Sequence, residues 1–199
     1  MADKRIKLLA DIEQEVIKLK KSPLYAERIK NGTFPVIGGG SHRAKVMFVG
    51  EAPGRNEAKT GKPFIGSAGK ILDQMFQSIG MERSEVYITS IVKDRPPLNR
   101  DPSPKEITIY GPFLDRQIEI IRPRVIATLG RFSMEYVIRL FGLGNQLKPI
   151  SKMHGKSFGA KASYGPIKII TLYHPAVAIY NQSSKGTLLE DFKILKQYI

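Results

Sequence analysis

The segment Ala44-Lys45-Val46-Met47-Phe48-Val49-Gly50 decides the fold class of this sequence. It is a short apolar run with β-branched residues, and its glycine opens a Gly- and Pro-rich stretch that reaches residue 66. A continuous apolar run of this length, followed by such a loop, is typical of a strand buried on both faces of a sheet. The sequence therefore predicts a buried strand over residues 44–49 that delivers a loop.

Three later segments have the same short, apolar and β-branched character, at residues 86–92, 124–130 and 167–172. Helix-length segments precede, separate and follow these strands, at residues 6–19, 68–79, from 104 onward, 133–141 and from 187 to the terminus. Strands that alternate with helices form a mostly parallel sheet covered by helices on both faces. The sequence therefore predicts one α/β domain over residues 1–199, a three-layer α/β/α arrangement with a central, mostly parallel four-stranded sheet.

Local signals indicate several boundaries. Ser103 can cap the helix that Pro104 begins, and Glu106 follows three residues after Ser103, which is the signature of a capping box. The Gly-Gly-Gly-Ser run at 38–41 is interpreted as a loop, and the Gly- and Lys-rich segment 143–166 as a long loop or a hairpin.

The chain is strongly basic, with 32 Lys and Arg residues against 18 Asp and Glu residues and a formal net charge of +14. Such an excess indicates a polyanionic partner such as nucleic acid, although a basic surface can also bind nothing specific. The positive charge is spread along the chain instead of gathered in a tail, which favours a basic face on a folded domain.

The sequence contains no cysteine. This excludes a disulfide framework, a thiolate-bound zinc ion, a cysteine-ligated iron–sulfur cluster and a cysteine nucleophile. No run of about 18 apolar residues could span a membrane, and the first residues mix charges through their apolar positions, unlike a secretory signal. We therefore expect a soluble, cytoplasmic protein that does not associate with membranes.

In parallel sheets of this kind, binding sites lie beyond the carboxyl ends of the strands. Three of the predicted strand ends carry distinctive residues, in the segments 50–54, 90–100 and 173–181. We therefore expect these three segments to converge on one site.

The first of these loops does not match a nucleoside-triphosphate-binding loop. Six residues separate Gly54 from Gly61, and Pro63 stands where that motif requires Ser or Thr after Lys62. The glycines of the loop either let backbone amides approach a ligand closely or form a tight turn and nothing more.

Several side chains near these strand ends have both a functional and a structural interpretation. His174 precedes a proline at a strand end, where it can donate a hydrogen bond or act as an acid, or be purely structural. Glu51 is a candidate base or water-positioning group, but it could equally cap a helix or pair with a lysine. Phe64 is either a core residue or a stacking platform for a nucleobase. His42 and His154 fall in loops, and the spacing of the histidines indicates no metal site.

Four stretches resemble, in order and in spacing, the motifs of the family 4 uracil-DNA glycosylases. They are GEAPGRNEAKTGKPFIGSAG (50–69), VYITSIVKDRPPLNRDPSP (86–104), PFLDRQIEIIRPRVIATLG (112–130) and YHPAVAIYNQ (173–182). The resemblance runs from about residue 22 to the end of the chain. It implies a doubly wound α/β fold and an enzyme that flips a deaminated base out of DNA and cleaves its N-glycosidic bond.

The resemblance also implies roles for individual residues. Phe64 would stack on the flipped uracil, His174 would hydrogen-bond uracil O2 and stabilise the departing anion, and Glu51 would help to position the attacking water. The first loop and the second strand end would complete the base-binding pocket with Gly50, Ala52, Pro53, Gly54 and Ser90. The loop 95–100, with two arginines among prolines, and the stretch after His174 would hold the flanking DNA strand through Arg95, Asn99, Arg100, Asn181 and Lys185.

The sequence departs from the family pattern at the four cysteines that bind an iron–sulfur cluster. The matching positions are Leu19, Ser22, Asp94 and Gly111. No cluster can form in this way. We therefore expect no cofactor, and we expect ordinary packing to hold the N-terminal helix and the loop 95–100.

A second departure concerns recognition of the base, because Ser90 stands where the family has a uracil-reading asparagine. An amide offers a donor and an acceptor together, which matches the O4 and N3–H groups of uracil, whereas a hydroxyl cannot present that pair. The loss of one paired contact to a buried base edge costs about 1–3 kcal/mol. Ser90 therefore bears on both the rate and the preference for uracil.

The leading hypothesis is a monofunctional, monomeric glycosylase that acts without metal on DNA containing uracil or another deaminated base. One alternative is a catalytically weak or inactive DNA-binding protein of the same fold. Another is a glycosylase retuned to hypoxanthine or xanthine.

Overall fold

The computed structural model describes residues 3–181 and 183–198. Its centre is a six-stranded sheet with the strand order β1-β3-β2-β4-β6-β5. The strands are β1 (Gly39–Gly40), β2 (Val46–Gly50), β3 (Tyr87–Ser90), β4 (Val125–Leu129), β5 (Lys156–Ala162) and β6 (Gly165–Leu172). The α-helices are α1 (Lys4–Ile17), α2 (Pro23–Lys30), α3 (Arg55–Thr60), α4 (Ser67–Ile79), α5 (Pro104–Ile121), α6 (Arg131–Leu140), α7 (Ile150–Met153), α8 (Val177–Tyr180) and α9 (Ser184–Phe192). Short 3-10 turns cover Pro97–Asn99, Gly144–Gln146 and Lys193–Tyr198.

The four strands predicted from the sequence form the parallel centre of the sheet, in the order β3, β2, β4 and β6. The α/β class and the mostly parallel sheet are therefore confirmed. The predicted number of strands is too low, because β1 and β5 extend the two edges of the sheet as antiparallel strands.

The sequence did not predict the two edge strands, and each omission has a physical reason. β1 consists of two glycines, which carry no side-chain pattern that could indicate a strand. β5 is mostly exposed or half-buried, because an edge strand needs no continuous apolar run. It pairs along its whole length with β6, so the hairpin is the correct interpretation of this part of the segment 143–166.

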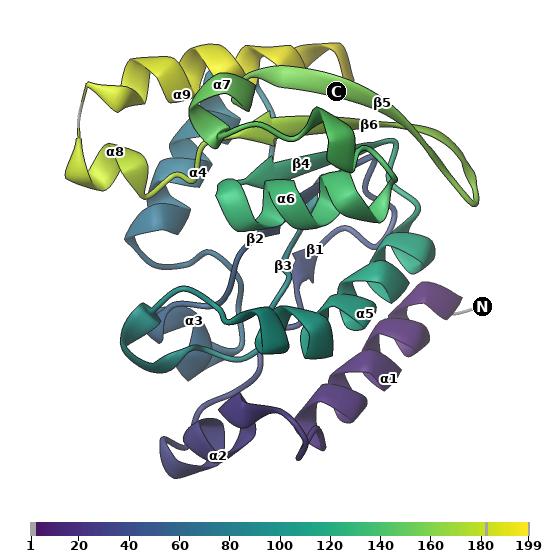
Figure 1. The fold of residues 1–199 in the computed structure, drawn as a ribbon, viewed down its shortest axis with the longest axis vertical. Coiled ribbons are helices and arrows are strands. Elements are labelled where there is room, and N and C mark those ends of the chain that lie inside the picture. Colours follow the sequence, from purple (N-terminus) through teal and green to yellow (C-terminus); the bar gives the residue numbers. More distant parts are fainter. Residues whose placement is uncertain (1–2, 182, 199) are drawn as a thin grey trace.

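Each face of the sheet is covered by its own helices, because successive side chains of a strand point to opposite faces. Met47 and Val49 of β2 pack with buried residues of α1, α5 and α6 in one hydrophobic core. Val46 and Phe48 pack with buried residues of α4 and α9 in a second core. Figure 1 shows α1 and α5 side by side at one side of the molecule and α4 and α9 close together at another, in agreement with their contacts. The result is the predicted three-layer arrangement.

The helix boundaries follow local signals in the sequence. Helix α5 begins with the predicted capping box, in which the Glu106 amide donates to Ser103 Oγ and the Ser103 amide donates to Glu106 Oε2. The predicted N-terminal helix corresponds to α1, and α2 then begins at Pro23 with Ser22 as its N-cap. Across residues 3–181 and 183–198, no helix has the length and apolar character needed to cross a membrane.

The parallel strands β2, β3 and β6 end along the same border of the sheet, which we call its carboxyl edge to distinguish it from the two sides formed by β1 and β5. Their carboxyl ends deliver the segments 50–54, 90–100 and 173–181 to that edge. The predicted convergence of these segments is therefore a property of the sheet topology.

Candidate functional site

A cavity of about 500 Å³ lies at this edge of the sheet. Its wall takes residues from all three converging segments and from the beginning of α4. All of the predicted catalytic and base-binding residues except Gly50 line it: Glu51, Ala52, Pro53, Gly54, Phe64, Ser90 and His174. Two of the predicted DNA-binding residues, Asn99 and Arg100, line it as well.

Phe64 is a buried part of this wall and has an unusual backbone angle φ of 49°. Its ring centroid lies 5.8 Å from that of His174, with 34° between the ring planes. A Cβ atom on Gly50 would lie 2.7 Å from Phe64 Cζ, so Gly50 supports the ring from behind instead of lining the cavity. A Cβ atom on Gly69 would collide with the Phe64 carbonyl group. The two glycines therefore fix where the ring lies, and backbone strain such as the positive φ of Phe64 is common at functional sites.

His174 is held in one tautomer and one charge state. Its Nδ1 atom accepts a hydrogen bond of 3.2 Å from the Ala176 backbone amide, so the proton of the neutral ring is on Nε2. Burial lowers the pKa of His174 to about 4, against a smaller opposing effect of Glu57. At neutral pH the ring is therefore an uncharged hydrogen-bond donor at the cavity.

Glu51 is half-buried at the end of β2. Burial, with a smaller contribution from the nearby Asp101, raises the pKa of Glu51 to about 7, and Arg131 opposes this rise. Asp101 and Arg131 form an ion pair with each other. Sequence reasoning did not connect these two residues with Glu51, because they come from separate segments. A carboxyl group with this pKa is suited to take a proton near neutral pH.

Ser90 ends β3 and is buried at the cavity. Within the described residues no side chain or backbone group hydrogen-bonds its hydroxyl, which leaves this group available to a ligand. Its carbonyl oxygen accepts a hydrogen bond from the ammonium group of Lys93, at 2.5 Å. Lys93 is fully buried. The sequence analysis assigned no role to Lys93 or to its hydrogen-bond partner Gln117.

Comparison with known proteins extends these observations. The sequence profile of the uracil DNA glycosylase superfamily matches residues 37–194. The chain belongs to this superfamily. The match includes the residues named above at the cavity, so the site lies within the part of the chain that the superfamily shares.

Individual relatives sharpen the assignment within the uracil-DNA glycosylase superfamily. The chain is 47% identical over 190 residues to a type-4 uracil-DNA glycosylase from Sulfurisphaera tokodaii, and the matched region covers 95% of this chain and 84% of the relative. It is 43% identical over 185 residues to a type-4 uracil-DNA glycosylase from Archaeoglobus fulgidus, and here the matched region covers 93% of this chain and 90% of the relative. A type-5 uracil-DNA glycosylase from Pyrobaculum aerophilum is 30% identical over 157 residues, or 71% of this chain and 66% of the relative. The resemblance to family 4 is confirmed.

In this member of the superfamily, the loop after β3 is held by a side-chain hydrogen bond within the loop and by an ion pair to α5. Arg95 Nε donates to Asn99 Oδ1 at 2.6 Å. Arg100 pairs with both oxygens of the buried Glu106, at 2.9 and 2.6 Å, and stays 46% exposed. Leu98 lies between them with a φ of 56° and an exposed fraction of 94%. Arg100 is thus already engaged in an ion pair, while Asn99 and Arg100 still reach the cavity wall.

The remaining predicted DNA-binding residues lie outside the cavity wall. Arg95, Asn181 and Lys185 are not among the residues that line it. Asn181 accepts hydrogen bonds from the backbone and side chain of Ser183, at 3.1 and 2.6 Å, and Lys185 is exposed on α9. Tyr180, to which the sequence analysis assigned no role, lines the cavity and is 89% exposed.

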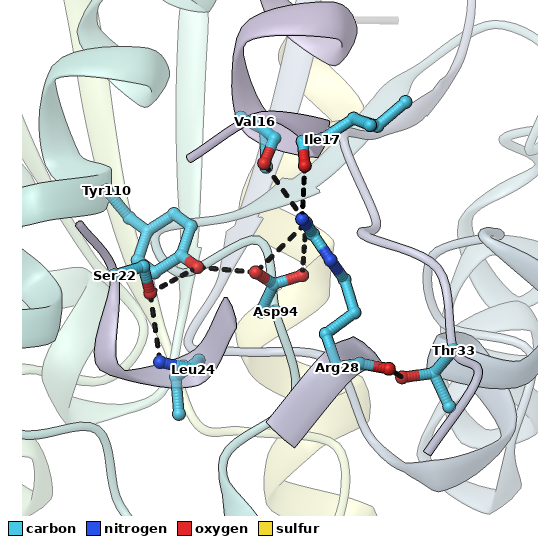
Figure 2. Close-up of polar contacts among 8 residues, drawn as sticks. All are labelled: Val16, Ile17, Ser22, Leu24, Arg28, Thr33, Asp94 and Tyr110. Carbon is cyan, nitrogen blue, oxygen red and sulfur yellow. Dashed lines mark hydrogen bonds and ion pairs between the residues drawn. The ribbon is translucent and has the colours of Figure 1, made fainter. Parts of the chain in front are cut away.

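Two of the four positions matched to the cluster cysteines, Ser22 and Asp94, belong to a buried polar network (Figure 2). Ser22 Oγ and the Tyr110 hydroxyl are 2.7 Å apart, and the Tyr110 hydroxyl donates to Asp94 Oδ2 at 2.5 Å. Arg28 Nη1 lies 3.1 Å from Asp94 Oδ1, and the same guanidinium group donates to the carbonyls of Val16 and Ile17. We call Ser22, Arg28, Asp94 and Tyr110 the anchor network. It joins α1, α2 and α5 to the loop after β3, so this junction depends on a buried ion pair as well as on the expected packing.

The residues at this place do not fit an iron–sulfur cluster. Cysteine is absent from the sequence, and the anchor network fills the space between Ser22 and Asp94. A Cβ atom on Gly111 would collide with the Tyr136 hydroxyl, and Leu19 is buried in the hydrophobic core. In the described part of the chain no group of three or more His, Asp or Glu side chains is placed to hold a metal ion.

Proposed function

We propose that this protein is a DNA glycosylase that hydrolyses the N-glycosidic bond of a flipped, deaminated base, with uracil as its main substrate. The observation that carries the proposal is the placement of Phe64, His174 and Glu51 on one cavity, with His174 as a neutral Nε2–H donor. The type-4 relatives, which are named uracil-DNA glycosylases, support the same activity.

Each of the three side chains has a role that follows from its state. Phe64 offers a fixed ring on which a flipped base can stack. Glu51, once ionised, accepts a proton from a water molecule whose oxygen bonds to the sugar carbon. The bond between that carbon and the base nitrogen breaks, and its electron pair leaves with the base. The Nε2–H group of His174 donates to the carbonyl oxygen on which the negative charge collects.

Ser90 favours a second, broader range of substrates. Its hydroxyl can donate to a carbonyl oxygen of uracil, but its single oxygen cannot present a donor and an acceptor side by side to the carbonyl and the ring N–H group, as the two atoms of an amide do. A rotating hydroxyl is equally able to meet the carbonyl oxygen of hypoxanthine or xanthine. We propose that these bases are excised as well, and that excision of uracil is slower than an asparagine at this position would allow.

We further propose that residues around the cavity hold the DNA strand on either side of the flipped base. The net charge of +14 favours binding to the phosphate backbone. The proposed contacts are Arg95, Asn99, Arg100, Asn181 and Lys185. The working form is proposed to be a cytoplasmic monomer, a single domain over residues 1–199 with no cofactor. Light scattering of the purified protein tests the monomer, and iron analysis tests the absence of an iron cofactor.

Single-turnover cleavage of labelled oligonucleotides tests the proposed activity. The substrates contain uracil, hypoxanthine or xanthine, in single and double strands, and His174→Ala is the matched control. We expect cleavage of uracil DNA that falls by at least about 100-fold in the control, as is typical when one preorganised donor is removed. If no substrate is cleaved while uracil-containing DNA still binds, the protein is a DNA-binding member of the superfamily and the proposed activity is wrong.

A further inference from the structure

Lys93 is a fully buried cation directly behind the cavity wall. None of its side chain is exposed, and its Nζ atom donates three hydrogen bonds. The acceptors are the Ser90 carbonyl oxygen at 2.5 Å, Gln117 Oε1 at 2.5 Å and Thr89 Oγ1 at 2.9 Å. Because Ser90 itself lines the cavity, a single residue separates the ammonium group from the cavity.

The surroundings of Lys93 are arranged for the protonated form. Gln117 Nε2 donates to the Ile37 carbonyl oxygen at 2.8 Å, which turns the amide oxygen toward Lys93. The Thr89 hydroxyl donates to the same carbonyl at 2.6 Å, which leaves a lone pair for Lys93. An ammonium group has three N–H donors for these three acceptors, whereas a neutral amine has two, so the Thr89 hydroxyl would have to turn away from the Ile37 carbonyl to keep a hydrogen bond with it.

No carboxylate balances this charge at hydrogen-bond distance within the described residues. Asp115 attracts it through space, but the Asp115 carboxylate accepts its hydrogen bond from the Tyr136 hydroxyl, at 2.8 Å. Burial lowers the pKa of Lys93 to about 7, which reflects the free-energy cost of holding the charge there. An unbalanced buried cation is unfavourable in the free protein, and an anion that forms beside it would relieve that cost.

We propose that Lys93 is a positioning residue that acts through Ser90 and whose charge stabilises the base as it leaves as an anion. This inference rests on the proposed glycosylase function. The intact nucleotide carries no charge on its base, so Lys93 interacts weakly with it. When the glycosidic bond breaks, its electron pair moves onto the base, and the attraction to Lys93 grows in surroundings of low polarity. Lys93 transfers no proton and keeps its three hydrogen bonds throughout.

A comparison of two leaving bases, uracil and 5-fluorouracil, tests this inference more specifically than a loss of activity on uracil alone. Fluorine at the 5-position of uracil withdraws electrons and already stabilises the departing anion, so 5-fluorouracil depends less on the protein's charge. We expect Lys93→Met to slow single-turnover excision of uracil by about 10- to 100-fold and to slow excision of 5-fluorouracil much less. Lys93→Arg keeps the charge and is expected to restore the native ratio of the two rates.

Thr89→Val is the matched control, because it removes one hydrogen bond of Lys93 and leaves its charge. We expect this variant to slow both bases by the same factor. Should Lys93→Met fail to fold, Lys93→Gln replaces it, since this side chain is also neutral and can donate to the same oxygens. Equal slowing of both bases by the neutral variant would show that Lys93 only supports the fold. Native protein that excises neither base would instead refute the proposed function.

Discussion

Glu51 and His174 share one cavity, and burial acts on their ionisation in opposite directions. It raises the pKa of Glu51 to about 7 and lowers the pKa of His174 to about 4. An acid and a base that are buried together are both driven toward their neutral forms. Near neutral pH, His174 is uncharged, and Glu51 is close to its midpoint, where it can accept a proton from water.

We expect the excision rate of the native protein to pass through a maximum near pH 7. The rate rises with pH as Glu51, with a pKa of about 7, loses its proton and becomes a base. It falls again as Lys93, whose pKa is also about 7, loses its charge. His174 does not titrate in this range. A pH series of single-turnover rates checks this profile: Glu51→Gln should lose the acid limb together with about 100-fold or more of the rate. An acid limb that persists in this variant would assign it to another group.

Ser90→Asn tests how the base edge is recognised. We expect faster excision of uracil, because the amide restores a donor and an acceptor together, a gain of about 1–3 kcal/mol in the transition state. Excision of hypoxanthine should not gain in proportion. The measurement is the ratio of the uracil rate to the hypoxanthine rate in single turnover, compared between the native protein and the variant. An unchanged ratio would mean that other residues read the base.

At the scale of elements, the anchor network connects parts that are distant in the sequence. Asp94 begins the loop that reaches the cavity, Tyr110 lies on α5, and Arg28 on α2 holds the last carbonyls of α1 (Figure 2). All three side chains are buried. Removing one partner of a buried ion pair leaves the other charge uncompensated, which is costlier than losing a single contact.

Asp94→Asn should therefore destabilise the protein by about 3–5 kcal/mol, because Arg28 keeps its charge in a buried site. Tyr110→Phe should cost less, about 1.5–3 kcal/mol, since it removes the hydrogen bonds of the hydroxyl to Asp94 and Ser22 but leaves the ion pair of Arg28 with Asp94 intact. Tyr164→Phe is the control, because the Tyr164 hydroxyl donates only to the Pro123 carbonyl, at 3.1 Å. Urea unfolding of the three variants measures these differences. Equal losses for the two tyrosine variants would show that the network contributes no more than an ordinary hydrogen bond.

The loop after β3 carries strain at Leu98. Its φ of 56° is unfavourable for a residue with a side chain, and its 94% exposure leaves few contacts in return. Leu98→Gly should raise the stability by about 0.5–1 kcal/mol, after allowance for the greater freedom of glycine in the unfolded chain. Thermal unfolding provides the measurement. A lower melting temperature would mean that the leucine makes contacts that outweigh the strain.

The parallel strands and the cavity could be predicted because their signals are local. Apolar runs such as residues 44–49 indicate buried strands by themselves, and Glu51 and His174 stand where such strands end. Lys93 could not be assigned a role in this way, because its partner Gln117 comes from a distant helix and the sequence does not show that the lysine is buried. The pairing of Arg28 with Asp94 joins residues 66 positions apart, and no local pattern indicates it.

At the scale of the whole molecule, the net charge of +14 dominates the expected encounter with DNA. Cations that contact phosphates release counterions, so the binding constant depends steeply on salt. The charge is distributed along a chain that folds around one sheet, and the cavity opens at a single edge of that sheet. We therefore expect the whole surface to attract DNA, and only this cavity to recognise a base.

We expect the affinity for undamaged DNA to fall by about 10-fold or more between 50 and 200 mM salt, whatever the DNA sequence. Binding titrations at several salt concentrations give the slope, and Lys185→Ala should reduce it by about one. Ser90→Asn is the control, since it changes the cavity without changing the charge. A slope that Lys185→Ala leaves unaltered would exclude this lysine from the phosphate contacts.

The anchor network has a consequence for how the protein is made. It consists of ordinary side chains, Ser22, Arg28, Asp94 and Tyr110, that lie in place once α1, α2 and α5 have packed. Completion of this junction is thus part of folding itself, and the junction takes up no iron or sulfide. We therefore expect this part of the molecule to form in a cell starved of iron as readily as in one with ample supply.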